Sequence, residues 1–132
     1  MCIRGKQHGP NMEMNQLKKI MEVNDFSGHD VIITGGEPSI HRQYSEIVQY
    51  IAVKAKTVTV TTNGTLDLEL DKLSKINNLF FQLSLDGSEK FHDKVRGAKA
   101  FKKTWRNILR LDSIGCNYAI ASVVSKKNLT GI

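Results

Sequence analysis

A glycine pair followed by a glutamate and a proline, Gly35-Gly36-Glu37-Pro38, ends an apolar run in the stretch IITGGEPSI, residues 32–40. Glycines let backbone carbonyl and amide groups approach a ligand closely, because no Cβ atom stands in the way. Glu37 adds a hydrogen-bond acceptor beside them, and Pro38 fixes φ and can begin a following helix. The combination suits a site in which backbone carbonyls hold an ammonium group.

Two further turns have a similar composition, and each ends an apolar or β-branched run. Asn63-Gly64-Thr65 follows TVTVTT, and residues 84–87 follow LFFQL. In parallel α/β folds, ligands bind beyond the carboxyl ends of the strands, in open sheets as in barrels. We therefore expect these turns to share one edge of a sheet and to form the ligand-binding edge.

The elements that position these turns are predicted from hydrophobic periodicity. Apolar residues recur at helical spacing in four segments, and each segment precedes a short strand-like run. The helical segments contain Leu17, Ile47, Leu70 and Trp105, the first after a possible cap at Asn11, and the strand-like runs are 31–34, 57–64, 79–87 and 118–124. Such alternation predicts an α/β fold with a parallel sheet of βα units, in one domain over residues 1–132.

One face of this sheet is predicted to be polar. Successive strand residues point to opposite faces, so alternate residues of the second and third strands share a side. That side would carry Thr57, Thr59, Thr61, Asn63, Phe80, Gln82, Ser84 and Asp86. Polar groups buried against helices would each need a partner, so we interpret this face as a ligand-holding interior. The alternative is the ordinary preference of threonine for strands.

The charge balance permits an anionic partner without specifying one. Lysine and arginine number 19 against 13 acidic residues, which gives a net charge of +6. Within residues 90–110, however, the basic side chains recur at helical spacing opposite Phe101 and Trp105, which is typical of a solvated helix face. No basic run is interleaved with aromatic residues, so nucleic-acid binding is the least favoured function.

Cysteine content and hydropathy indicate a cytoplasmic protein that does not enter a membrane. No run of about 18 apolar residues occurs, and the amino terminus lacks the order of a secretory signal. Cys2 and Cys116 are the two cysteines. They are too few for a disulfide framework and suit a reducing compartment.

The ordered set TGGEP, TTNGT, LSLDG and HDKVRG, at βα spacing between about residues 30 and 128, resembles the radical S-adenosylmethionine (SAM) enzymes. The resemblance implies a partial TIM-like barrel whose first strand is missing, with SAM and a [4Fe-4S] cluster as cofactors. In that family the cluster supplies the electron that splits the SAM sulfonium and yields a 5′-deoxyadenosyl radical. The stretch SLDGSEKFHDKVRG is most similar to the peptide- and protein-modifying branch that includes anaerobic sulfatase-maturating enzymes.

The resemblance also implies roles for individual residues. Gly35 to Pro38 would line the site for the methionyl amino group, while Ser84 and Arg96 would hold the methionyl carboxylate, which an arginine fork matches bidentately. Asn63 would border the ligand, although an Asn-Gly turn needs no function to explain it. Further candidates for a ribose or adenine contact are Ser122 and Asn128.

Other polar residues near these motifs are interpreted structurally. Asp86 before Gly87 is expected to serve the turn, and His92 and Asp93 are expected to be loop or cap residues. Cys116 is expected to be a small buried hydrophobic residue. No catalytic acid or base is identified.

The cluster motif of the family, CxxxCxxC, is incomplete in this sequence. Cys2, in MCIRG, resembles its third cysteine and is the expected cluster ligand. We therefore expect the chain to be a piece of a longer enzyme, truncated at both ends and inactive alone. A missing first strand would leave an open sheet edge, which predicts self-association of the isolated chain.

Three functions are compatible with these patterns. The first is a radical SAM enzyme, or a fragment of one, that modifies a peptide or protein. The second is a non-catalytic module that binds SAM or an acidic partner without a cluster. The third is a basic nucleic-acid binder, whose affinity would fall steeply with salt.

Overall fold

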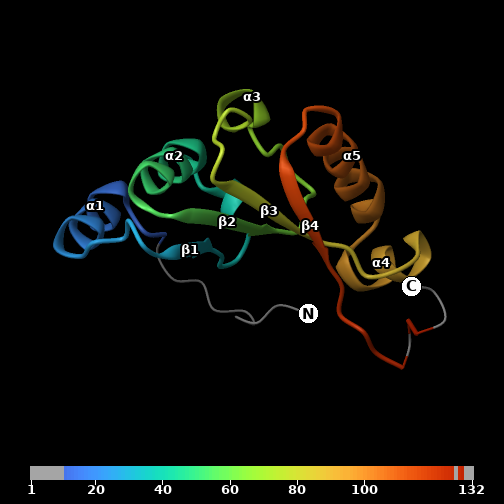
Figure 1. Ribbon diagram of the computed structural model, residues 1–132. Helices are drawn as coiled ribbons and strands as arrows, with labels where there is room; N and C mark the ends of the chain where they lie inside the picture. Colours follow the sequence, from blue (N-terminus) through green and yellow to red (C-terminus); the bar gives the residue numbers. More distant parts are fainter. Residues whose placement is uncertain (1–10, 127, 130–132) are drawn as a thin grey trace.

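The computed structural model describes residues 11–126, 128 and 129 and has one four-stranded sheet (Figure 1). All strand pairs are parallel, and the spatial order β1-β2-β3-β4 follows the chain. The strands are β1 (Asp30–Ile33), β2 (Thr57–Thr62), β3 (Leu79–Ser84) and β4 (Asn117–Ala121). The parallel α/β class predicted from the sequence is confirmed, and the last strand is shorter than expected because it ends at Ala121.

The helices largely cover one face of the sheet. In chain order they are α1 (Met14–Val23), the 3-10 helix η1 (Pro38–Ile40), α2 (Tyr44–Lys54), α3 (Leu70–Leu73), α4 (Glu89–Arg96) and α5 (Ala100–Ser113). Figure 1 shows α1, α2, α3 and α5 side by side along this face, with α4 beside α5 near the carboxyl end of β3. This is the one-sided arrangement of consecutive βα units.

Three local expectations need correction. The first helix begins after Glu13 rather than after Asn11, and the Gln16 side chain accepts a hydrogen bond of 2.9 Å from the Glu13 backbone N–H. The third helix is a single turn, because Leu70–Leu73 alone is helical. Helix α4 was not expected as a separate element, and it contains both His92 and Asp93.

The predicted alternation of β2 and β3 is confirmed within the strands. The side chains under the helices are Val58, Val60, Phe81 and Leu83, all at most 1% exposed. The opposite face carries Thr59, Thr61, Gln82 and Ser84, all partly exposed. On this open face Thr61 Oγ1 donates a hydrogen bond of 3.1 Å to Gln82 Oε1, so the polar side chains of neighbouring strands contact one another.

Within residues 11–126, 128 and 129, no helix combines the length and the apolar character that a bilayer span requires.

Candidate functional site

The turns that follow the four strands lie at one edge of the sheet, because all four strands run in the same direction. Hydrogen bonds gather the polar residues of this edge into two groups. One group joins the turn after β1 to the end of β2. The other joins the turn after β3 to α4 and to the segment after β4.

Glu37 is the centre of the first group. Its Oε1 accepts hydrogen bonds from Thr62 Oγ1 at 2.6 Å and from Ser39 Oγ at 2.8 Å, and its Oε2 accepts one from the Asn63 N–H at 2.8 Å. The Ser39 N–H donates to Oε1 as well, at 3.3 Å. The carboxylate therefore fastens the Gly35-Gly36 turn to the end of β2, and Pro38 begins η1 as predicted.

Open space borders both glycines of the turn after β1. A Cβ atom built on Gly35 or Gly36 would meet no atom of the described residues within 4 Å. Gly35 has φ +154°, a backbone conformation that residues with side chains rarely adopt, whereas neither φ nor packing of the described residues explains the glycine at position 36. A ligand that approaches its backbone groups would explain it.

Two sets of hydrogen bonds fix the turn after β2, one within the turn and one from α5. Asn63 Oδ1 accepts hydrogen bonds from the N–H and the Oγ1 of Thr65, at 2.8 and 2.7 Å, which makes an Asx turn. From α5, Thr104 Oγ1 donates to the Asn63 carbonyl at 2.7 Å, and Asn107 Nδ2 donates to the Gly64 carbonyl at 2.9 Å. The Asn63 side chain is therefore committed to the turn through its oxygen.

Asp86 is the centre of the second group, and it was interpreted wrongly from the sequence. It is only 2% exposed, and its Oδ2 accepts a hydrogen bond of 2.6 Å from Arg96 Nε, while its Oδ1 accepts one of 2.9 Å from the Val123 N–H. The sequence also placed Asp86 on the polar face of the sheet. Because β3 ends at Ser84, the alternation of side chains between the two faces does not extend to Asp86, and its side chain does not lie on the open face. Its carboxylate is an ion-pair partner rather than a simple turn acceptor.

His92 was also interpreted wrongly, whereas the expectation for Asp93 is confirmed. His92 is fully buried inside α4, and its Nδ1 accepts a hydrogen bond of 3.1 Å from the Asp86 N–H. The Asp93 carboxylate accepts hydrogen bonds of 2.8 Å from the N–H groups of Lys99 and Phe101 at the start of α5. Asp93 therefore caps the next helix.

The remaining candidates lie near the second group. Ser84 is partly exposed on the open face at the end of β3. Ser122 donates a hydrogen bond to the Leu85 carbonyl. Asn128 is buried, and its side chain closes a loop by donating to the Val123 carbonyl at 2.7 Å and accepting from the Ser125 N–H at 2.7 Å.

The two groups do not contact each other through their predicted ligand-binding residues. Among the described residues, no hydrogen bond connects the segment 35–38 with Ser84 or Arg96. β2 lies between β1 and β3, and two strand spacings amount to about 10 Å. The site thus consists of two polar half-sites on either side of the end of β2.

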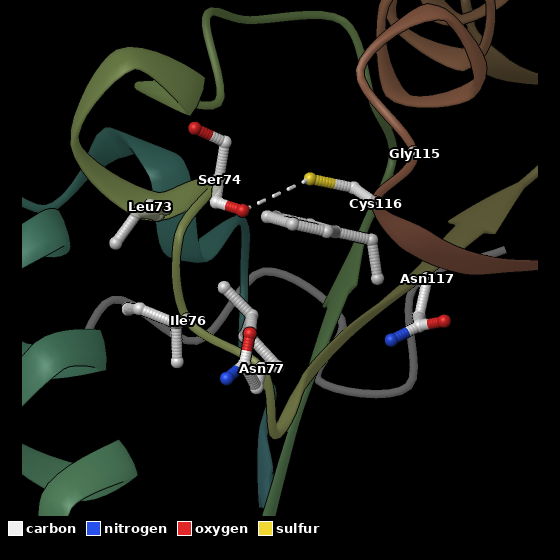
Figure 2. Close-up of a pocket in the computed structure, with 9 residues that line it drawn as sticks. Leu73, Ser74, Ile76, Asn77, Gly115, Cys116 and Asn117 are labelled. Atoms are coloured by element: carbon white, nitrogen blue, oxygen red, sulfur yellow. Dashed lines mark hydrogen bonds between the residues drawn. The ribbon is translucent and has the colours of Figure 1, made fainter.

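The cysteines do not contribute to this edge in the described part of the chain. Cys2 lies within residues 1–10, outside the residues that the structure describes. Cys116 is half-buried against the core, as expected for a small hydrophobic residue, and burial raises the pKa of its thiol. It lines a pocket of about 100 Å³ with Ser74 and Asn117, at the amino end of β4 and far along the strands from the ligand-binding edge (Figure 2).

Within the described residues, no three His, Cys, Asp or Glu side chains gather to hold a metal ion. The residues present there do not fit an iron–sulfur cluster, which requires a set of thiolates.

The electrostatics of the second group favour a charged Asp86 and a neutral His92. Burial raises the pKa of Asp86, but the Arg96 hydrogen bond, the Val123 N–H and the nearby positive charge outweigh it and bring that pKa below the usual value. Burial is the main cause that lowers the pKa of His92, and the charge of Arg96 acts in the same direction. The imidazole is therefore neutral at neutral pH, with its proton on Nε2.

His92 makes the stability of the protein pH-dependent. The unfolded chain takes up a proton near the ordinary histidine pKa of about 6.5, whereas folded His92 does so only at lower pH. We expect the contribution of His92 to the free energy of unfolding to fall as the pH is lowered from about 7.5, by at most about 1.4 kcal/mol per pH unit, and to level off below the folded pKa. Carboxylates with a lowered pKa, such as Asp86, continue the loss of stability at lower pH. Urea unfolding at several pH values measures this slope.

A non-titrating variant identifies the group responsible. His92→Asn retains an acceptor for the Asp86 N–H and should have a flatter pH profile, whereas His29→Asn, at an exposed position, should retain the slope of the parent chain. Equal slopes in the parent chain and His92→Asn would show that another group titrates.

One protein-family model matches almost the whole chain. The family model described as the Radical SAM superfamily matches residues 1–128. The sporulation killing factor maturation protein SkfB of Bacillus subtilis (strain 168) is 28% identical over 122 residues, which are 88% of this chain and 30% of SkfB. The antilisterial bacteriocin subtilosin biosynthesis protein AlbA of the same organism is 39% identical over 103 residues, which are 74% of this chain and 23% of AlbA.

Solved structures show the same fold. The structure of histidine-tagged anSMEcpe with bound AdoMet matches with a TM-score of 0.74 and 21% identity over 97% of this chain and 41% of that chain. A second structure, native anSMEcpe with bound AdoMet and Kp18Cys peptide, gives a TM-score of 0.74 at 19% identity over 96% and 40%. This chain therefore has the fold of part of a TIM-like barrel, and it spans less than a third of SkfB and AlbA.

Proposed function

We propose, because this chain belongs to the radical SAM superfamily, that its strand-end edge binds SAM and that the protein acts in the modification of a peptide or protein. The chain's own residues would do this by gripping the two charged groups of the methionyl moiety. Backbone carbonyls at Gly35 and Gly36 would accept hydrogen bonds from the ammonium group. Ser84 and Arg96 would donate to the carboxylate.

One observation carries this proposal. Two polar half-sites lie at the same edge of a parallel sheet, one with glycines open to the outside and one with an arginine whose side chain is 18% exposed. The ammonium of an α-amino acid can donate hydrogen bonds to backbone carbonyls, and its carboxylate can accept them from a guanidinium. Asn63, Glu37 and Pro38 would shape the first half-site, and Ser122 would border the nucleoside.

Members of the superfamily use SAM together with a [4Fe-4S] cluster, which supplies the electron that cleaves the sulfonium to methionine and a 5′-deoxyadenosyl radical. Cys2 is the proposed cluster ligand in this chain. We also propose that the protein is cytoplasmic, because its low cysteine content suits a reducing compartment.

A peptide substrate is favoured by two separate observations. The names of SkfB and AlbA refer to a maturation and a bacteriocin biosynthesis protein, and one anSMEcpe structure contains a peptide. The open face of the sheet presents hydroxyl and amide groups from Thr59, Thr61 and Gln82, which can hydrogen-bond to peptide groups. A peptide lying across this face would place its reacting residue near the SAM edge.

A side chain at Gly36 provides the test. Because a Cβ at this position meets no atom within 4 Å in the part of the chain that the structure describes, we expect Gly36→Val to change the free energy of unfolding by only about 0.5 kcal/mol. The isopropyl group would occupy the space proposed for the ligand, so SAM affinity should fall about ten-fold or more. Equilibrium dialysis with labelled SAM measures the affinity.

Gly28→Val is the matched control, since Gly28 also has open space around it but precedes β1 at the other end of the strand. Equal SAM affinity in the parent chain and Gly36→Val would contradict the proposed position of the ligand. Anaerobic reconstitution with iron and sulfide, of this chain and of a chain extended at its amino terminus, then separates the alternatives. Formation of 5′-deoxyadenosine by the extended chain indicates an enzyme, whereas SAM binding without 5′-deoxyadenosine from either chain indicates a non-catalytic module.

A further inference from the structure

Asp86 is the most deeply buried acidic residue of the ligand-binding edge. Its side chain is 3% exposed and forms an ion pair with Arg96 through Oδ2, at 2.6 Å from Nε. A buried ion pair seldom improves stability over apolar packing, because both charges lose their water. The pair therefore requires an explanation other than stability.

The atoms used by the ion pair determine how Arg96 can act. A guanidinium has five N–H donors in a planar fork, and Asp86 takes the one on Nε. Within the described residues, no acceptor contacts the two terminal nitrogens. Asp86 thus holds the side chain through Nε, while the two terminal nitrogens remain available. These are the nitrogens that can bind a carboxylate bidentately.

The second oxygen of Asp86 extends this anchor to β4. Oδ1 accepts a hydrogen bond of 2.9 Å from the Val123 N–H, and the neighbouring Leu85 N–H donates to the Ala121 carbonyl at 2.9 Å. One carboxylate thus connects the end of β3, the last turn of α4 and the segment after β4. The backbone of Asp86 is itself fixed by the buried His92.

We propose that Asp86 is a positioning residue for SAM: it holds the Nε edge of Arg96 so that the terminal nitrogens face the methionyl carboxylate. This inference rests on the proposed function. It adds a residue that does not itself touch SAM. Asp86 acts by fixing the orientation of the Arg96 side chain.

Two effects of Asp86 on SAM binding have opposite signs. Its negative charge weakens the attraction of Arg96 for a second carboxylate. Its hydrogen bonds keep a long, flexible side chain in one orientation, which saves the entropy of ordering that side chain when the ligand binds. If the charge dominated, removal of Asp86 would strengthen SAM binding, and if orientation dominates, removal weakens it.

The test compares SAM with decarboxylated SAM, which has the same nucleoside, sulfonium and ammonium but lacks the carboxylate. In the 132-residue chain, we expect Asp86→Ala to weaken SAM binding about ten-fold or more and to leave binding of the decarboxylated compound within about two-fold. Asp86→Asn retains an acceptor oxygen without the charge and should lie between the parent chain and Asp86→Ala. Calorimetric titration of each chain with both compounds measures the affinities.

Asp67→Asn serves as the matched control, because Asp67 also pairs with an arginine, Arg110 at 3.3 Å, but its side chain is exposed. It should bind both compounds as the parent chain does. If Asp86→Ala weakened the binding of both compounds equally, Asp86 would have only a general structural role. If the binding of SAM were unchanged or tighter, the inference would be overturned while the proposed function stands. Failure of the parent chain to bind either compound would overturn the proposed function and the inference together.

Discussion

Replacement of Gly64 by alanine is expected to lower the free energy of unfolding by about 2–4 kcal/mol, the sum of a backbone and a packing penalty. Gly64 has φ +68°, a left-handed conformation that disfavours any Cβ atom. A Cβ would also lie 2.9 Å from Leu83 Cδ2 and 3.0 Å from Thr104 Cγ2. Both neighbours are fully buried, so neither can move aside without disturbing the core. Urea unfolding of the parent chain and the variant measures the loss.

Two other glycines separate the two penalties. Gly115 has the same φ, +68°, but open space around it, so Gly115→Ala should show the backbone penalty alone, about 1–2 kcal/mol. Gly28 has neither constraint, and Gly28→Ala should change stability by less than about 0.5 kcal/mol. Equal losses at Gly64 and Gly115 would mean that the contacts with Leu83 and Thr104 relax without cost.

Removal of the Glu37 carboxylate is expected to cost about 2–4 kcal/mol of unfolding free energy, because several donors lose their acceptor together. Thr62 Oγ1 and the Asn63 N–H point to Glu37 at 2.6 and 2.8 Å, and Thr62 is only 2% exposed. In Glu37→Ala these groups would remain desolvated without a partner. Glu37→Gln retains one acceptor oxygen and should lose about half as much. Thermal and urea unfolding report both variants.

Glu13→Ala is a suitable comparison, since Glu13 also forms a short ion pair, with Arg42 at 2.6 Å, but both side chains are more than half exposed. Exposed pairs contribute about 0–1 kcal/mol, so this variant should be close to the parent chain. A loss at Glu37 no larger than the loss at Glu13 would indicate that water replaces the carboxylate in the turn.

The sheet and its polar face could be predicted because strand geometry fixes them locally. The period of two in TVTVTT places Val58 and Val60 on one side and Thr57, Thr59 and Thr61 on the other whatever the rest of the chain does, and the structure has this alternation. The turns after the strands were identified for a similar reason. Gly35, Gly36 and Gly64 signal a backbone that approaches something closely, and composition alone reveals this.

Helix α4 and the Asp86 group could not be predicted from local pattern. Phe91 and Val95 are the apolar residues of α4 and lie on one face at i,i+4 spacing, but a single such pair is too short a pattern to predict a separate helix. The contacts of Asp86 with Val123 and of Asn107 with Gly64 span 37 and 43 residues. Pairings at such separations depend on how the βα units stack, which no single segment determines. This is also why Thr62 and Asn107 were missed.

The grip of α5 on the turn after β2 has a kinetic consequence. Thr104 and Asn107 bind the Asn63 and Gly64 carbonyls across 41 and 43 residues of chain, so this turn cannot reach its final shape until β3 and α5 have formed and docked. Contacts between such distant segments form slowly, because a long loop must close first. We therefore expect the rim of the sheet to mature last during folding, after the valine-rich interior has collapsed.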